Sequence, residues 1–280
     1  MSQTYLPELR EADATGAVAD IYAEIRACSG VPYVSTLQRF LATLPGVLEF
    51  GWSVVRPVML SGAAPEAAWQ AAAAADPPPL PPLTPPVLRL LGVGADDLQA
   101  IRTIAANFAR VSPVNVVTGA LLEPLTEGAA PPSGPGFGAA AWTPPAMLAD
   151  MPPLPAMDGL SDDLRAALQT LMVPIGGQPF LPALYRQFAA WPAFAAYLAA
   201  IIPPRRQDAS VIAAEKRAID GIVAAGQALY GQLPPPPASV QPPDPATAAL
   251  IKEAIGRYRN TSADMICTGQ ALLKALPETL

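Results

Sequence analysis

The chain has 280 residues, of which 51% are hydrophobic and 14% are charged, and its formal net charge is −6. This composition is typical of a folded protein rather than a disordered chain, and the acidic balance argues against a nucleic-acid surface, which requires a basic patch. The sequence contains no histidine, which excludes Ser-His-Asp and Cys-His nucleophile systems, so a carboxylate, Tyr, Lys or bound water would have to transfer protons.

Apolar residues recur at helical spacing along most of the chain. A first helix after Asp13 or Thr15 carries Ile21 and Ile25 on one face and stops at Gly30. No segment alternates with the period of a β-strand, and the sequence therefore predicts an all-α fold. Further helices are predicted over 34–43, 46–57 and 65–75, from Asp96 or Asp97, from Ser112, from Ser161, and over 208–230, 246–258 and 262–276.

Three stretches are too rich in proline or glycine for regular structure. Residues 76–86 (DPPPLPPLTPP) and 234–245 predict polyproline-like spacers lying on the surface, and a plain linker is favoured over a PxxP ligand for a partner domain. Residues 128–155 form a Gly/Pro/Ala-rich linker. This linker divides the chain into two helical units, 1–127 and 156–280.

Secretion and membrane insertion are not predicted. The N-terminal residues lack the apolar core of a signal peptide, and the most apolar window, 188–202, is broken by Pro192 and is shorter than the roughly 20 residues of a membrane span. Cys28 and Cys267 are too few for a disulfide framework or a zinc site. We therefore expect a cytoplasmic protein with no bound metal and no nucleic-acid or membrane partner.

One stretch of the first unit recurs in the second. Residues 30–45 (GVPYVSTLQRFLATLP) align without a gap to residues 177–192 (GQPFLPALYRQFAAWP), at an offset of 147. Six identities in sixteen positions exceed the one or two that this composition gives by chance, roughly. The identical pairs are Gly30/Gly177, Pro32/Pro179, Leu37/Leu184, Arg39/Arg186, Ala42/Ala189 and Pro45/Pro192.

A second stretch recurs in the same order. Residues 112–122 (SPVNVVTGALL) correspond to residues 262–273 (SADMICTGQALL), mostly at an offset of 150, and both contain the pair Thr-Gly. Two signatures at nearly one offset predict an internal duplication of a multi-helix unit of about 130 residues, fused into a pseudo-dimer.

Arg39 and Arg186 recur at equivalent positions of otherwise apolar helices. One of them could bind a carboxylate, because a guanidinium group suits bidentate recognition. Alternatively, each ties its helix to neighbouring segments. The recurrence favours the structural interpretation, since an asymmetric site needs only one copy.

Residues 24–52 and 178–192, together with the proline-tethered duplication, resemble the group I 2-haloacid dehalogenases. The resemblance implies an all-α pseudo-dimer, without cofactor or metal, whose active site lies between the two repeats. It also implies that an aspartate activates the water that displaces halide from a small 2-halocarboxylic acid of either configuration. The family's Ser-Asp pair falls on Ala183 and Leu184, so the expected base is replaced by leucine.

The same resemblance places the remaining substrate-binding positions. The family's aromatic residue after the proline of the first signature, here Pro32, corresponds to Tyr33, and the family's second aromatic residue of the substrate pocket falls on Thr36. The family's asparagine falls on Ser112, with Asn115 one turn later, and its C-terminal tyrosine corresponds to Tyr258.

Asp264 is the candidate for a substitute base. The alternative, which we favour, is a carboxylate in the first turn of a helix beginning at Ser262, where it would stabilise the helix N-terminus. Glu49, in the helix after Pro45, is a weaker candidate and is expected to be solvated or paired with Arg56.

Three functions follow as hypotheses. The first is a haloacid dehalogenase-like hydrolase, and the second is a relative that only binds a small apolar carboxylic acid between the repeats. The third is a scaffold whose inter-repeat space is filled. The sequence leaves a homodimer open, and the lining of the inter-repeat space discriminates the three.

Overall fold

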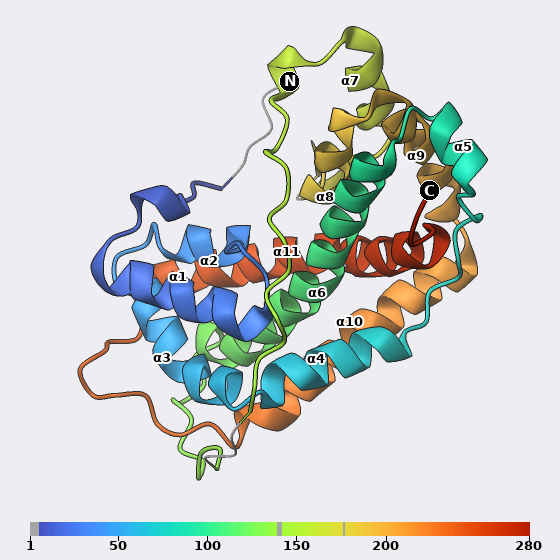
Figure 1. Cartoon of the computed structure of the whole chain (residues 1–280). Helices are drawn as coiled ribbons and strands as arrows, with labels where there is room; N and C mark the ends of the chain where they lie inside the picture. The colour runs from blue at the N-terminus through green and yellow to red at the C-terminus, as the bar shows by residue number, and fades with distance from the viewer. Residues whose placement is uncertain (1–5, 139–141, 176) are drawn as a thin grey trace.

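The computed structural model describes residues 6–138, 142–175 and 177–280. Two long helices, α6 (Ala95–Thr126) and α11 (Pro245–Ala275), cross in the middle of the molecule and pack extensively on each other, and the shorter helices surround them (Figure 1). On the N-terminal side these are α1 (Gly16–Ser29), α2 (Thr36–Leu41), α3 (Val47–Leu60), α4 (Ala63–Ala74) and α5 (Pro85–Leu90). On the C-terminal side they are α7 (Asp162–Gln169), α8 (Ala183–Gln187), α9 (Pro192–Arg205) and α10 (Ala209–Tyr230), with short 3-10 turns at Glu11–Asp13, Met157–Gly159 and Phe188–Ala190.

The predicted helical class is confirmed, with one addition. Strands β1 (Val173–Ile175) and β2 (Gln178–Phe180) form a small antiparallel hairpin, which the sequence did not predict. Each strand has three residues with a proline in the middle, and these two prolines pair with each other. Strands this short and proline-centred show no alternation of apolar and polar residues, so the period-2 signal is absent.

Two predicted helix breaks are wrong. The helices expected to begin at Ser112 and Ser262 are the second halves of α6 and α11, which continue through both positions. Pro113 is tolerated inside α6 although it cannot donate a helical hydrogen bond. In α11 the hydroxyls of Thr261 and Ser262 donate to the carbonyl oxygen of Tyr258 at 3.1 and 2.6 Å, so side chains that resemble a cap lie within the helix.

The recurring glycines of the second signature lie where the long helices approach closely. A Cβ on Gly119 of α6 would come within 3.1 Å of the Ile255 side chain of α11. A Cβ on Gly269 of α11 would come within 3.2 Å of the Ala105 carbonyl oxygen of α6. A larger residue at either position would push the helices apart.

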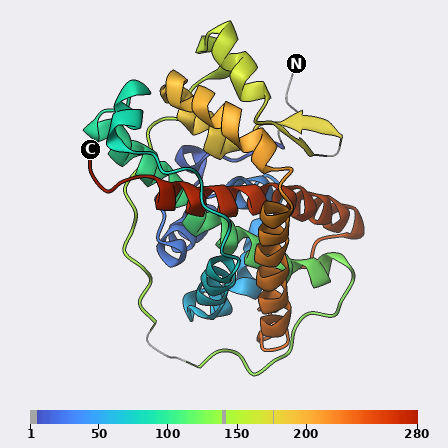
Figure 2. The same ribbon diagram turned by 90° about the vertical axis from the view of Figure 1, so that its right-hand side faces the viewer.

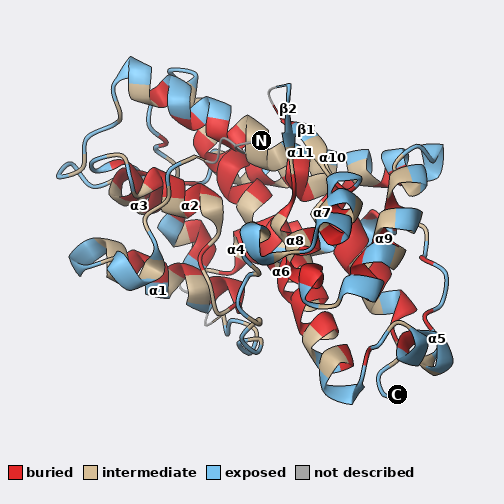
Figure 3. Ribbon diagram, turned by 90° about the horizontal axis from the view of Figure 1, so that it is seen from above, coloured by how far each residue is buried: buried red, intermediate tan, exposed pale blue. Residues whose placement is uncertain are grey.

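Two hydrophobic clusters hold the helices together, and each contains residues from both sides of the 128–155 linker. Figure 3 shows the buried residues gathered in the middle of the molecule, around α6, α8 and α11. Leu80 and Leu83 belong to one cluster and are 3% and 1% exposed. The 76–86 spacer is therefore not simply surface-lying, because its leucines are packed into the core.

The described part of the 128–155 linker has no helix or strand and runs as a long connection around the outside of the helices (Figure 2). Hydrogen bonds fix its later part. The Arg110 guanidinium donates to the carbonyl oxygens of Gly30 and Ala146 at 3.1 and 2.8 Å, and the Leu148 amide donates to the Gly30 carbonyl at 3.0 Å.

Candidate functional site

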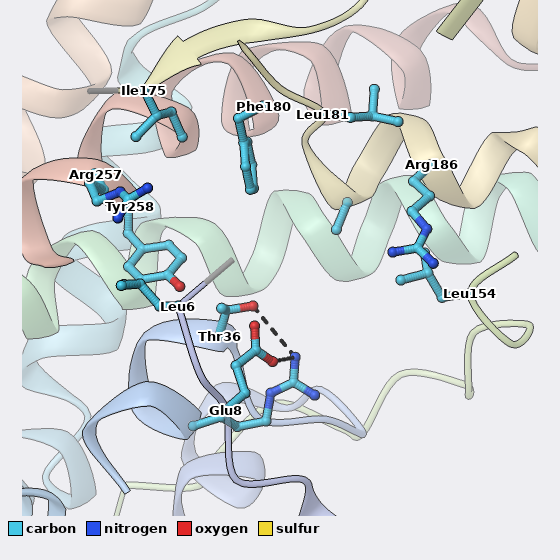
Figure 4. A pocket seen from close by; sticks show the side chains of 12 residues that line it. Leu6, Glu8, Thr36, Leu154, Ile175, Phe180, Leu181, Arg186, Arg257 and Tyr258 are labelled. Carbon is cyan, nitrogen blue, oxygen red and sulfur yellow. Dashed lines mark hydrogen bonds and ion pairs between the residues drawn. The ribbon is translucent and has the colours of Figure 1, made fainter. Parts of the chain in front are cut away.

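A cavity of about 360 Å³ lies between α2, α8 and α11 and is bordered by the β1–β2 hairpin and by the segment that precedes α1. Figure 4 shows side chains from these elements directed toward one another across it. Two residues from each helix line it, and all of them except Ala183 are polar: Thr36 and Arg39, Ala183 and Arg186, and Arg257 and Tyr258. Apolar side chains cover much of the remaining wall: Leu6, Leu154, Ile175, Phe180 and Leu181.

The cavity lies where the two copies of the first signature face each other. Thr36 and Ala183 are equivalent positions at the starts of α2 and α8, and Arg39 and Arg186 are equivalent positions near their ends. The recurring arginines therefore line one shared space.

Arg39 is already neutralised. Its Nη2 lies 2.6 Å from Oε2 of Glu8, and it also donates to the Thr36 hydroxyl at 3.4 Å. The backbone carbonyl of Arg39 accepts a hydrogen bond from the Leu9 amide at 3.0 Å, which fixes the segment carrying Glu8. Glu8 and Arg39 thus form a closed pair at the cavity wall.

Arg186 has no acidic partner among the residues that the structure describes. Its Nε donates to the Pro155 carbonyl oxygen at 2.9 Å, which orients the guanidinium and leaves the two Nη groups for other acceptors. This half-buried cation borders Leu154, Leu181 and the other apolar walls. A charged group in such surroundings is stabilised by a counter-ion with matching donors and acceptors.

Arg257 is also weakly compensated. Its side chain is 23% exposed, and its acidic contact is the exposed Glu253, whose Oε1 lies 3.7 Å away. In the described chain Arg257 makes no side-chain hydrogen bond. Three guanidinium groups and one described carboxylate line the cavity, which leaves two positive charges in excess.

Tyr258 adds a neutral hydroxyl to the same wall. Burial raises the pKa of this tyrosine, so the hydroxyl keeps its proton at ordinary pH and can donate it in a hydrogen bond. No hydrogen bond from this hydroxyl to another described residue occupies it, and in Figure 4 it points toward the cavity.

The structure brings together only part of the predicted site. Thr36, Ala183 and Tyr258 line the cavity, whereas Leu184 is fully buried behind it. Tyr33 is also absent from the lining: its ring contacts Phe108 at a centroid distance of 6.3 Å.

Asn115 and Ser112 do not line this cavity either. Asn115 borders a narrow space of about 10 Å³ next to Tyr258, and its Oδ1 accepts hydrogen bonds from Ser35 and Gln38 at 2.9 and 3.2 Å. Ser112 is buried within α6. Both residues therefore lie on α6 outside the larger cavity.

Asp264 is neither in a first helical turn nor in the cavity. It lies deep within α11 and is 7% exposed, so the prediction of a helix N-terminal carboxylate is wrong. The Tyr185 hydroxyl lies 2.8 Å from both carboxylate oxygens, the Thr268 hydroxyl donates at 3.1 Å, and Arg206 Nη2 donates at 2.7 Å. These contacts make Asp264 the centre of a buried polar cluster.

Of the two alternatives expected for Glu49, solvation or pairing with Arg56, the pairing is wrong. Arg56 pairs with Glu24 at 2.6 Å rather than with Glu49. Glu49 lies in the first turn of α3, beside the 239–244 segment.

Sequence reasoning missed Glu8 and Arg257. Glu8 lies in a segment without helical periodicity, and its proximity to Arg39 depends on how that segment folds back. Arg257 immediately precedes Tyr258, but the direction of its side chain depends on the helical phase of α11, which the sequence predicted as two separate helices.

No cluster of three metal-ligating side chains occurs among the described residues. None of the described helices is both long and apolar enough to span a membrane.

Comparison with solved structures identifies the fold. A D-2-haloacid dehalogenase mutant superimposes with a TM-score of 0.73 at 15% identity, over 97% of this chain and 96% of that chain. A mutant complexed with D-2-CPA gives 0.71 at 16% identity, and a complex of D-2-haloacid dehalogenase with L-LA gives 0.69 at 15%, both with the same coverage. No protein-family model matches the sequence, and the search of curated proteins gives no match. The chain therefore shares the fold of the D-2-haloacid dehalogenases along nearly its whole length, as the resemblance seen in its sequence predicts.

Proposed function

We propose that this haloacid dehalogenase-like protein binds a small apolar carboxylic acid in the cavity between α2, α8 and α11. The observation that carries the proposal is Arg186, a half-buried guanidinium that borders an apolar cavity and has no acidic partner in the described chain. A ligand carboxylate would supply the missing counter-ion.

The rest of the lining suits such a ligand. The hydroxyls of Thr36 and Tyr258 offer neutral donors, and Ile175, Phe180 and Leu181 offer an apolar wall for the organic part. A volume of about 360 Å³ is at the lower end of small-molecule sites. The two complexes among the structural neighbours, with D-2-CPA and with L-LA, are consistent with a small ligand in this fold.

The first prediction concerns Arg186. We expect propionate and 2-chloropropionate to bind the wild-type protein in titration calorimetry, and Arg186→Gln to weaken both by about tenfold or more, because a charge-assisted hydrogen bond contributes about 1.5–3 kcal/mol. Arg89→Gln, an exposed position on α5, is the matched control and should bind like wild type. Equal affinities for wild type and Arg186→Gln would contradict the proposal.

A second candidate function is hydrolysis with Glu8 as the base. Glu8 is the one carboxylate among the described residues that line the cavity. It would take a proton from water as the new C–O bond forms at C2 and the carbon–halogen bond breaks, releasing halide. The ion pair with Arg39 opposes this role, because the Glu8 oxygen that would accept the proton already accepts from the Arg39 guanidinium at 2.6 Å.

The second prediction separates binding from catalysis. We expect no halide release from racemic 2-chloropropionate above the rate of a heat-inactivated sample, since Leu184 supplies no base and Glu8 is engaged by Arg39. If the wild type releases halide, and Glu8→Gln loses this activity while still binding 2-chloropropionate, the hydrolytic function would instead be established.

A further inference from the structure

We infer that the preferred ligand of this cavity is a small dicarboxylic acid, with one carboxylate at Arg186 and the other at Arg257. The inference rests on the proposed function, which it narrows from carboxylic acids in general to acids with two carboxylates.

The charge balance of the cavity is the first argument. Glu8 neutralises Arg39, with 2.6 Å between the charged atoms, so this pair needs no ligand. Arg186 and Arg257 remain, each with a guanidinium that lacks a hydrogen-bonded acid among the described residues. A monocarboxylate would compensate one of them, whereas a dicarboxylate would compensate both.

The burial of Arg257 is the second argument. A cation whose side chain is only 23% exposed has lost much of its hydration, and the contact with Glu253 at 3.7 Å is too long for a hydrogen bond. Arg257 therefore keeps its donors free for a second acceptor. Guanidinium groups hold carboxylates through paired donors, which makes arginine suited to this role.

The arrangement of the two arginines is the third argument. In Figure 4 Arg186 and Arg257 lie on opposite sides of the cavity, with Phe180 between them along the upper wall. Two cationic ends separated by an apolar wall complement a short chain with a carboxylate at each end. Tyr258, beside Arg257, adds a hydroxyl donor at that end.

The test compares acids of matched chain length. Titration calorimetry with malonate, succinate, glutarate and adipate, each beside the monocarboxylate of the same number of carbons, gives the ratio of affinities for every length. We expect the ratio to exceed about tenfold at the length that spans the two arginines and to fall on either side of it. Arg257→Gln should reduce that ratio to near one.

Each outcome has a separate meaning. If monocarboxylates bind and no dicarboxylate binds more tightly, the inference fails while the proposed function stands. If neither class binds, the proposed function fails as well. Arg257→Lys, which keeps the charge but not the paired donors, should give an intermediate ratio, and thermal unfolding of each variant must match wild type for the comparison to count. A preference that survives in Arg257→Gln would overturn the assignment of the second carboxylate to this residue.

Discussion

Glu215, on α10, is an acidic side chain whose environment disfavours its charge. It makes no hydrogen bond or ion pair with another described residue, and it lies close enough to Asp264 to be affected by that negative charge. The pKa of Glu215 is raised from 4.5 to about 7, mainly by burial and next by the negative charge of Asp264. The positive charges of Arg206 and Arg205 oppose this shift.

The third prediction follows from the sign of this shift. A folded-state pKa above the unfolded value means that the contribution of Glu215 to stability is present below about pH 4.5 and is lost as the pH rises through about 7. Relative to Glu215→Gln, the wild type should lose about 2 kcal/mol of unfolding free energy between pH 5 and pH 8; this is less than the full shift implies, because solvent screens the partly exposed side chain. Urea titrations of both proteins at the two pH values measure the difference. A difference that does not depend on pH would contradict the prediction.

At the scale of single residues, the sequence identified Arg39 and Arg186 through their recurrence. It could not decide between carboxylate binding and a structural role, because that depends on partners from distant segments. Arg39 has Glu8 as its partner, whereas in the described part of the chain Arg186 has only the Pro155 carbonyl oxygen. The two arginines, at equivalent positions, thus differ in whether their guanidinium groups are available to bind a ligand carboxylate.

Among the elements, α8 shows how one residue position decides whether a side chain reaches the cavity. Ala183, the first residue of α8, lines the cavity, while Leu184 is fully buried on a different face of the helix. Successive helical residues point about 100° apart, so the two positions cannot share a direction. The family's acid, placed on Leu184 by resemblance, would here enter the hydrophobic core.

The fourth prediction uses this pair of positions. Leu184→Asp should lower the unfolding free energy by more than about 3 kcal/mol, because it leaves a cavity and buries an unpaired carboxylate. Ala183→Asp should leave the protein folded and introduce a carboxylate into the cavity. Thermal unfolding monitored by circular dichroism measures the first effect. A Leu184→Asp variant as stable as wild type would contradict this account of α8.

Halide release from 2-chloropropionate then measures what the introduced carboxylate does. We expect Ala183→Asp to release halide above the wild-type background, with Ala183→Asn as the control that matches its size but provides no base. Equal background rates in Ala183→Asp and Ala183→Asn would show that the cavity does not hold the acid in a reactive position.

The long helices explain two errors of prediction at the scale of elements. Pro113 and the polar run 260–262 carry the local signals of helix ends. The packing of α6 on α11 around these positions stabilises both helices through them. Tertiary contact thus outweighs a local preference of a few kcal/mol.

On the scale of the whole molecule, the contacts between the two units are reciprocal. Helix α2 packs on α11 and helix α8 packs on α6, so each short signature helix contacts the long helix of the other unit. Gly30 and Gly177, the first identical pair, both have left-handed backbones, with φ of +62° and +76°. These correspondences support the proposal that the chain arose by duplication.

The two units differ in the polar groups that they bury. In the first, Ser35, Gln38 and Asn115 form a neutral network. In the second, Tyr185 and Asp264 occupy the corresponding region, and Arg206 pairs with Asp264 and lies over the Tyr185 ring, with its Cζ 5.2 Å from the centroid. This cluster joins α8, the end of α9 and α11, which are distant in the sequence. Removing one member of its buried ion pair would leave an uncompensated charge.

The sequence by itself determined the helical class, the proline-rich connections, the recurring signatures and the family whose fold the chain shares. These follow from periodicity, from backbone restrictions and from residues that recur at a fixed offset, all of which are local or directly comparable. Only the tertiary structure decided that Glu8 neutralises Arg39, and that among the described residues Arg186 has no acidic partner and Arg257 has only the 3.7 Å contact with Glu253. It also decided that Asp264 is enclosed by Tyr185 and Arg206. The physical reason is that charge compensation and desolvation depend on distances between segments far apart in the chain.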